Sequence, residues 1–161
     1  MNLREEHAYT YGAHSAFDWR RGAGPFLAWS AVQSDVTAEA ARELVREVER
    51  IRDEDVRPEE LSLATSYLEG VFPIRYESTA SIASALSSLV LYELPEDYFD
   101  TYRDRIRGVT AADVRRAAER HLHADALQLV VVGDPQAIRA PLEALGFGAL
   151  RVYDAEGKGM E

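Results

Sequence analysis

Few side chains in this sequence could serve as nitrogen or sulfur ligands of a metal ion. The 161 residues include four histidines and no cysteine, which excludes a disulfide framework, a thiolate zinc site and a cysteine nucleophile. The histidines are His7, His14, His121 and His123. His121 and His123 stand two residues apart and could touch a metal from one face of an extended segment. Alternatively they lie at the end of a helix, where the helix dipole favours histidine, and we expect no metal site in this chain.

Arg4 and Tyr11 are two further candidates, because a guanidinium and a phenol hydroxyl can each donate hydrogen bonds. Taken alone, Arg4 is a surface charge in an Arg-Glu-Glu run and Tyr11 is an aromatic residue of a strand. Spacing alone favours that structural interpretation.

Composition limits the partners and the number of domains. The 28 acidic and 18 basic residues give a formal charge of -10, which repels phosphate backbones and argues against a nucleic-acid partner. With 47% hydrophobic residues the chain can fill one core. We expect a single α+β domain over 1–154 and a polar tail over 155–161.

No targeting or membrane-spanning segment is apparent in the sequence. The N-terminus has no apolar stretch behind a basic start, and no apolar run approaches the roughly 18 residues that a membrane span needs. As written, the chain is expected to be cytoplasmic, but a longer parent protein could be periplasmic, so the compartment stays open.

Hydrophobic periodicity predicts strands at both ends of the chain and helices between them. Alternation predicts a hairpin from Tyr9 to Phe17 and from Phe26 to Gln33, and the apolar run Leu127 to Val132 predicts a centrally placed strand. A last strand is expected from Leu150 to Tyr153. Helices are predicted over 38–52, from Pro58 to Gly70 or Pro73, over 81–92, over 96–106, from a capping box at Thr110 and Asp113, and after an Asp134 cap. This order predicts an α+β fold with helices packed on one face of a mostly antiparallel sheet.

Several motifs, in order along nearly the whole chain, carry a family resemblance. The segment LREEHAYTY (3–11) resembles the L-R-E-(E/K)-x-G-x-x-Y segment of insulinase-type (pitrilysin) zinc peptidases and of mitochondrial processing peptidase-like proteins. Further matching segments are DVTAEA (35–40), 59–77, LYELPEDYF (91–99), VTAADVRRAAERHL (109–122) and VVVGD (130–134). The chain resembles the C-terminal, inactive half-domain of these enzymes, which implies a half-domain of the LuxS/processing-peptidase type.

The resemblance implies that zinc belongs to a partner. Enzymes of this family bind zinc on an H-x-x-E-H helix, and no histidine of this chain stands in that motif. The chain is therefore predicted to be inactive alone and to work beside an H-x-x-E-H subunit or domain that holds the zinc.

The resemblance also implies the role of Arg4 and Tyr11, which is to bind the carbonyl of a peptide substrate and stabilise the oxyanion. Ala8 stands where the family commonly has glycine, so the turn that presents Tyr11 is expected to differ if it needs φ > 0. Tyr9 is a nearby second hydroxyl, on the same strand face.

Family half-domains also have a segment before the one that begins here, so Met1 is expected to be an internal methionine of a longer ancestor or an internal start, and the N-terminal part of the half-domain is expected to be missing. A sheet that lacks strands exposes unpaired backbone, which predicts an oligomer, a partner chain or a companion fragment. Two alternatives to the peptidase role stay open. One is a structural or interaction domain without any proteolytic role, and the other is a truncated remnant that folds poorly.

Overall fold

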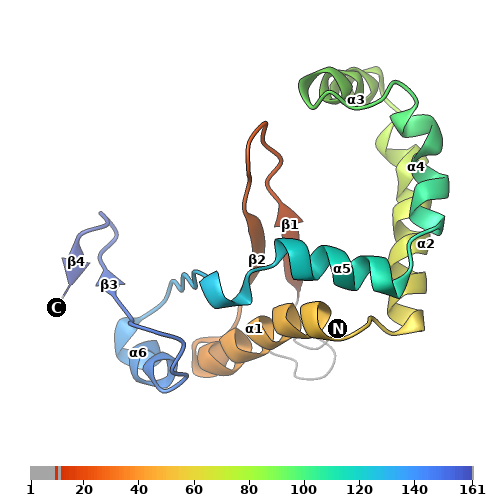
Figure 1. Ribbon diagram of the computed structural model, residues 1–161. Helices are drawn as coiled ribbons and strands as arrows, with labels where there is room; N and C mark the ends of the chain where they lie inside the picture. The colour runs from red at the N-terminus through yellow and green to blue at the C-terminus, as the bar shows by residue number, and fades with distance from the viewer. Residues whose placement is uncertain (1–9, 11, 161) are drawn as a thin grey trace. The chain divides into compact units, whose positions relative to one another are not determined.

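The computed structural model describes Thr10 and residues 12–160, and these form two compact units (Figure 1). The first, called here the hairpin unit, comprises Met1–Asp18, Pro25–Glu49 and His123–Glu161. The second, called here the helical unit, comprises Trp19–Gly24 and Arg50–Leu122. Each unit is described by itself below.

An antiparallel ladder of β1 (Ala13–Phe17) and β2 (Phe26–Ser30) gives the hairpin unit its name. Ala13 pairs with Ser30, and Phe17 pairs with Phe26, whose ring centroid lies 5.0 Å away. Such cross-strand aromatic pairs fix the register. The hairpin predicted from the sequence is confirmed, with shorter strands than the alternation suggested.

Two α-helices, two 3-10 helices and a small second ladder make up the rest of the described hairpin unit. The elements are η2 (Ser34–Val36), α1 (Thr37–Asp53, whose last turn belongs to the helical unit), η3 (Ala124–Ala126), α6 (Pro135–Glu143), β3 (Val152–Tyr153) and β4 (Gly159–Met160). The predicted cap of α6 is confirmed, because the Asp134 carboxylate accepts a hydrogen bond from the Gln136 backbone N–H at 2.9 Å. The final strand is also confirmed as β3, which pairs antiparallel with β4 in the segment expected to be a polar tail.

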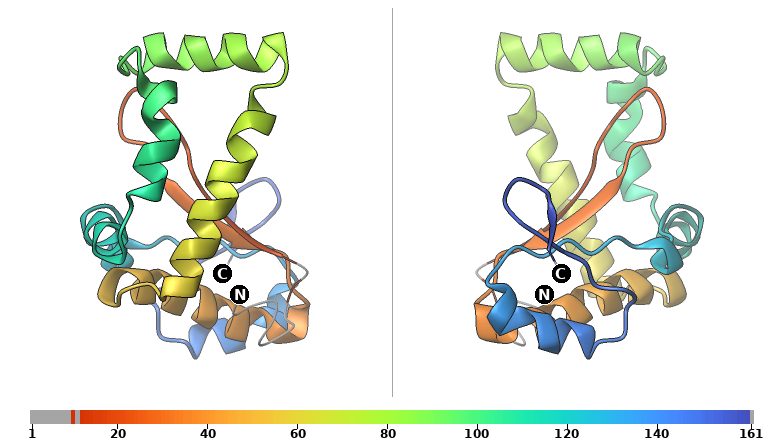
Figure 2. Two further views of the ribbon diagram at one scale, coloured as in Figure 1. Left: turned by 90° about the vertical axis from the view of Figure 1, so that its right-hand side faces the viewer. Right: turned by 90° about the vertical axis from the view of Figure 1, so that its left-hand side faces the viewer.

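The helical unit consists of α2 (Pro58–Arg75), α3 (Thr79–Leu91), α4 (Tyr98–Arg107), α5 (Ala111–His121), the last turn of α1 and the hairpin tip. Helix α3 lies across the end where α2 finishes and α4 begins (Figure 2). The predicted capping box of α5 is confirmed, because the Thr110 hydroxyl accepts from the Asp113 N–H at 3.2 Å while the Asp113 carboxylate accepts from the Thr110 N–H at 3.0 Å.

Helix α2 continues past both residues that were expected to end or kink it. Gly70 lies inside the helix, and Pro73 lies only two residues before its end, so the proline disturbs only the last turn. Aromatic packing stabilises that turn: the Phe72 ring stacks on Tyr102 of α4 at 4.9 Å and meets Tyr76 edge-on at 5.1 Å. Tertiary contacts here outweigh local propensity.

The core of the described residues is small. Their buried hydrophobic side chains are Ala38, Ala40, Ala41, Val48, Ala118, Leu122 and Ile138. Many larger apolar side chains are exposed, including Leu63 at 72%, Val90 at 81% and Val132 at 94%. Composition predicted enough apolar residues for a core, but much of that apolar surface is open to solvent.

The strand predicted from Leu127 to Val132 is wrong for the described structure, in which this segment belongs to neither a helix nor a ladder. The physical reason is the lack of a partner. A strand satisfies its backbone N–H and C=O groups only through a neighbouring strand, and no described residue provides one here.

Candidate functional site

The predicted site residues Arg4 and Tyr11 lie outside the described residues, as do His7, Ala8 and Tyr9. Their roles therefore stay predictions. The structure does describe Thr10 and Gly12, the two residues that flank position 11, and these show how the chain is held next to the predicted tyrosine.

Hydrogen bonds attach both neighbours of position 11 to the open end of the hairpin. The Thr10 hydroxyl lies 2.9 Å from the Gly12 carbonyl oxygen and 2.7 Å from that of Ala31, and with one proton it donates to one of them at a time. The same hydroxyl accepts from the Gly12 N–H at 3.1 Å, and the Ser30 hydroxyl donates to the Gly12 carbonyl at 3.0 Å. Thr10 and Gly12, which precede and follow position 11 in the sequence, are thus hydrogen-bonded to Ala31 and to Ser30 of β2, respectively.

The Gly12 backbone also lies close to the His14 imidazole. A Cβ on Gly12 would lie 3.2 Å from His14 Nε2, so a larger residue would force the His14 side chain to move. The His14 ring in turn stacks on Trp29 across the ladder, with centroids 5.7 Å apart. The Thr10 hydroxyl, the His14 imidazole and the Trp29 indole, all of which can donate hydrogen bonds, therefore lie on residues 10–14 and on the strand paired with them.

In the described part of the chain, the side chains that could bind a metal ion are dispersed. No three side chains among its His, Asp and Glu residues lie close enough together to hold a metal. The prediction that His121 ends a helix is confirmed, because it is the last residue of α5, with the buried Leu122 as C-cap and the exposed His123 just beyond. These two histidines suit the negative end of the helix dipole.

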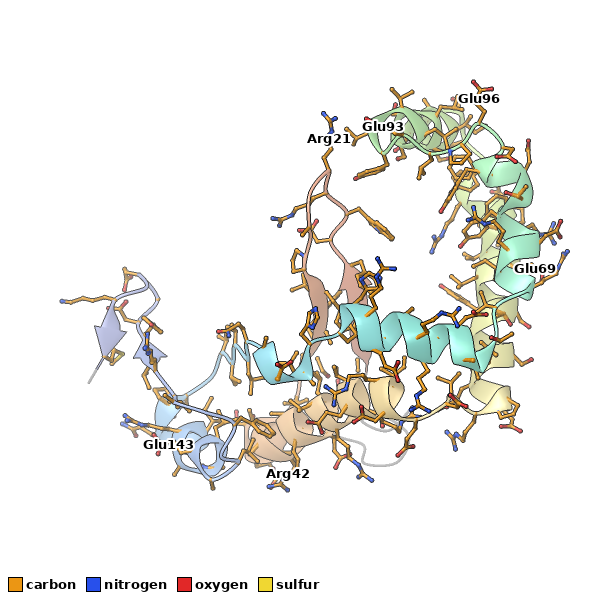
Figure 3. The ribbon with its side chains drawn as sticks, viewed as in Figure 1. Arg21, Arg42, Glu69, Glu93, Glu96 and Glu143 are labelled. Atoms are coloured by element: carbon orange, nitrogen blue, oxygen red, sulfur yellow. The ribbon has the colours of Figure 1, made fainter. Side chains whose placement is uncertain are left out.

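A charged cluster that the sequence analysis did not single out lies in the helical unit, where the Glu69 carboxylate of α2 binds two arginines of α4 (Figure 3). Arg103 Nη2 donates to Glu69 Oε1 at 3.0 Å, and the Arg107 Nε donates at 2.9 Å. These hydrogen bonds, that of Arg107 above all, lower the pKa of Glu69. Because the charges satisfy one another, the cluster holds α4 to α2. The sequence signal that could have revealed this cluster is the i,i+4 spacing of Arg103 and Arg107, which places both on one face of α4.

A shallow depression of about 190 Å³ in the helical unit is lined by Arg21, Leu91, Tyr92 and Glu93. It is smaller than the roughly 300 to 1,000 Å³ of typical ligand sites. The Tyr92 hydroxyl donates to the Trp19 carbonyl at 3.2 Å, and Arg21 faces Glu93 at 3.9 Å (Figure 3). These contacts attach the hairpin tip to the end of α3, which is a structural role.

Comparison with known proteins identifies the fold. No family model matches the sequence, and no curated protein is significantly similar to it. Among solved structures, the chain is similar to a crystal structure of a peptidase M16 inactive domain from Pseudomonas fluorescens, with a TM-score of 0.68 and 23% sequence identity. The chain has the fold of an M16 inactive domain. This confirms the α+β class and the resemblance to an inactive peptidase half-domain, at the level of the fold.

The M16 match covers 76% of this chain but only 29% of the solved chain. The M16-like piece described here therefore corresponds to a minor part of that structure. In the described ranges, no helix combines the length and the hydrophobicity that crossing a membrane requires.

Proposed function

We propose that this M16-like chain is the non-catalytic half of a zinc-dependent metalloendopeptidase, which forms an active site only beside an H-x-x-E-H half in another chain. The observation that carries the proposal is the fold, which over 76% of the chain is similar to a domain described as inactive. No three possible metal ligands lie together among the described residues, which is compatible with a zinc ion held by the partner.

In this proposal Arg4 and Tyr11 act on the substrate rather than on the metal. The guanidinium and the phenol hydroxyl donate hydrogen bonds to the carbonyl oxygen of the scissile peptide bond and stabilise the negative charge that develops there. The hydrogen bonds of Thr10 and Gly12 support the proposal, because a donor works best when the backbone on either side of it is fixed.

The test is reconstitution of peptidase activity. Mixing the chain with a zinc-bearing H-x-x-E-H half encoded next to it should produce cleavage of a fluorogenic peptide, whereas each half alone should produce none. Arg4→Ala or Tyr11→Phe should lower the turnover of the mixture by roughly 100- to 1000-fold, the cost of losing one oxyanion donor.

Matched controls separate a donor role from general damage. Arg42→Ala removes an exposed arginine of α1, and Tyr9→Phe removes the neighbouring hydroxyl, and both should leave turnover within about twofold. If Tyr9→Phe reduces turnover and Tyr11→Phe does not, the donor has been assigned to the wrong tyrosine.

A second candidate is an interaction domain without a proteolytic role, and the exposed apolar surface of the helical unit favours it. Leu63, Tyr67 and Ile74 of α2 are 72%, 63% and 62% exposed, and Val90 of α3 is 81% exposed. This candidate predicts a stable complex with the partner, the assembly of which is weakened by Leu63→Asp. It also predicts that Arg4→Ala changes nothing.

A further inference from the structure

Helix α3 ends in a Schellman motif whose left-handed residue is Glu93. The Leu94 N–H donates to the Leu89 carbonyl at 2.9 Å, which closes the outer turn of this motif. The Glu93 N–H donates to the Val90 carbonyl at 3.4 Å, which closes the inner turn. Glu93 has φ 53°, a conformation that glycine adopts far more readily than a residue with a Cβ. A glutamate therefore occupies the position at which such helix ends usually have glycine.

Glycine occupies the other positions of positive φ among the described residues. These positions are Gly146, Gly148 and Gly157, and Gly146 follows shortly after α6. A non-glycine residue with φ > 0 is uncommon, and such strain persists where the surrounding contacts hold it in place. The side chain of Glu93 is therefore expected to make a contact that glycine could not make.

Glu93 and the residue before it both contact the hairpin tip. The Tyr92 hydroxyl donates to the Trp19 carbonyl at 3.2 Å, and the Glu93 carboxylate lies 3.9 Å from the Arg21 guanidinium (Figure 3). All four residues belong to the helical unit. The Arg21 and Glu93 side chains are 74% and 84% exposed, so water and salt screen the attraction between them. These contacts are of a kind that opens and closes readily.

The ladder next to the tip has few contacts of its own. Among the described residues β1 pairs with β2 alone, all of β1 is exposed, and a two-stranded hairpin is marginally stable by itself. The rung nearest the tip is the bond from the Asp18 N–H to the Pro25 carbonyl at 3.0 Å, and Asp18 directly precedes Trp19. A tip held at Trp19 and Arg21 therefore limits fraying of the ladder from this end.

We propose that Tyr92 and Glu93 form a latch that holds the hairpin tip on the end of α3, and that the left-handed glutamate is the strained part of this latch. The Tyr92 hydroxyl holds the backbone at Trp19, and the Glu93 carboxylate attracts Arg21. Opening of the latch releases the tip and exposes the rung at Asp18 to exchange with water. The latch needs neither zinc nor a partner half, so it stands independently of the peptidase role.

The central experiment is Glu93→Gly in the full chain, because relief of strain and loss of the latch have opposite signs. Glycine relieves the left-handed conformation, so the midpoint of denaturant unfolding should stay the same or rise. Loss of the carboxylate releases Arg21, so the Asp18 amide, followed by NMR in the absence of denaturant, should exchange roughly twofold faster. A general loss of stability would instead lower the midpoint as well.

Tyr92→Phe tests the other half of the latch, because it removes only the hydroxyl. The Asp18 amide should exchange roughly two- to fivefold faster, as expected for the loss of one hydrogen bond. The matched control is Tyr67→Phe on α2, where the side chain is 63% exposed, and this variant should leave the exchange at Asp18 unchanged.

Reversal of the ion pair separates charge from strain. Arg21→Glu should speed the exchange at Asp18, because two carboxylates then face each other. The double variant Arg21→Glu with Glu93→Arg should restore the slow exchange, since it inverts the pair and keeps a non-glycine residue at position 93.

Three results would overturn the proposal. One is unchanged exchange at Asp18 in both Tyr92→Phe and Glu93→Gly. Another is a fall in the unfolding midpoint of Glu93→Gly, which would mean that the glutamate stabilises the fold as a whole. The third is equally fast exchange in Arg21→Glu and in the double variant, which would show that the pairing with Arg21 does not hold the tip. Each of these readouts is independent of peptidase reconstitution.

Discussion

The pair of helices α2 and α4 and the segment 127–132 are both rich in apolar residues, but among the described residues the helices have their backbone groups paired and the segment does not. Helices α2 and α4 satisfy their backbone groups internally, stack Phe72 on Tyr102 and join Glu69 to two arginines. The segment 127–132 has Val130 and Val132 open to solvent and makes no backbone hydrogen bond with any described residue. A helix satisfies most of its backbone hydrogen bonds within its own residues, whereas a strand needs another strand to do so.

This difference separates two kinds of apolar surface in one chain. The aromatic contacts between α2 and α4 stabilise the fold itself, so changes there should lower its stability. Val130 and Val132 of 127–132 are largely exposed, so changes at these side chains should alter the stability little. Four stability predictions test that division, in order of decreasing effect.

Phe72→Ala should have the largest effect. The ring contacts Tyr76, Phe99 and Tyr102, and truncation of a fully buried phenylalanine costs roughly 3 to 5 kcal/mol. Because Phe72 is only half-buried, we expect a loss of about 2 kcal/mol in the free energy of unfolding, measured by denaturant titration with circular dichroism. The control on the same helix is Leu63→Ala, which should stay within about 0.5 kcal/mol. Equal losses of unfolding free energy for Phe72→Ala and Leu63→Ala would contradict the claim that the aromatic contacts of Phe72 stabilise the fold.

Thr110→Ala should have the next effect, because it removes the side chain that accepts from the Asp113 N–H at the start of α5. Loss of such an N-cap typically costs about 1 kcal/mol. Thr110→Ser keeps the hydroxyl and should restore nearly all of the stability, which the same titration measures. A loss with serine as large as that with alanine would show that the methyl group, and not the cap, is what matters.

Acid should weaken the start of α2 through Glu60. The Arg57 side chain, at 2.9 Å, is the main cause that lowers the pKa of Glu60 from 4.5 to about 2, with Arg50 contributing as well. Because the folded pKa lies below the unfolded pKa, the stabilisation is complete above pH 4.5 and is lost as the pH falls towards 2. With the side chain 31% exposed, solvent screening reduces the expected loss to about 1 kcal/mol.

The measurement for Glu60 is the free energy of unfolding against pH, compared between the unchanged chain and Glu60→Gln. The two curves should differ above pH 4.5 and converge towards pH 2. Parallel curves over this range would contradict a stabilising role for the ionised carboxylate.

Val132→Ala should have the smallest effect on stability. At 94% exposure the side chain has almost no contacts to lose, so the free energy of unfolding should change by less than about 0.5 kcal/mol. A loss above 1 kcal/mol would mean that Val132 is covered in solution, and the contrast between the two regions would disappear.

The sequence predicted the helices and their caps well because those signals are local. Thr110 with Asp113 and Asp134 with Pro135 each place a cap and a helix start within a few residues, and the structure has both. The prediction for 127–132 failed for the opposite reason. Its composition indicates a strand, but pairing depends on residues elsewhere, and hydrophobic patterning carries no information about whether a partner strand is present.

The candidate site was harder to predict than the fold. The resemblance assigned Arg4 and Tyr11, whereas the described structure contributes the hydrogen bonds of Thr10, Gly12 and Ser30 that hold the chain on either side of position 11. No periodicity in the sequence indicates that a threonine hydroxyl reaches the Ala31 carbonyl 21 residues away. Such a contact follows from the hairpin register, which only the structure defines.

The most direct test of the account is the turnover of a peptide by this chain mixed with a zinc-bearing H-x-x-E-H half, compared for Arg4→Ala and Arg42→Ala. The account predicts no cleavage by either half alone. It also predicts a drop of roughly 100- to 1000-fold in the mixture with Arg4→Ala and no significant change with Arg42→Ala. Equal turnover with the two variants, or cleavage by this chain alone with stoichiometric zinc, would contradict it.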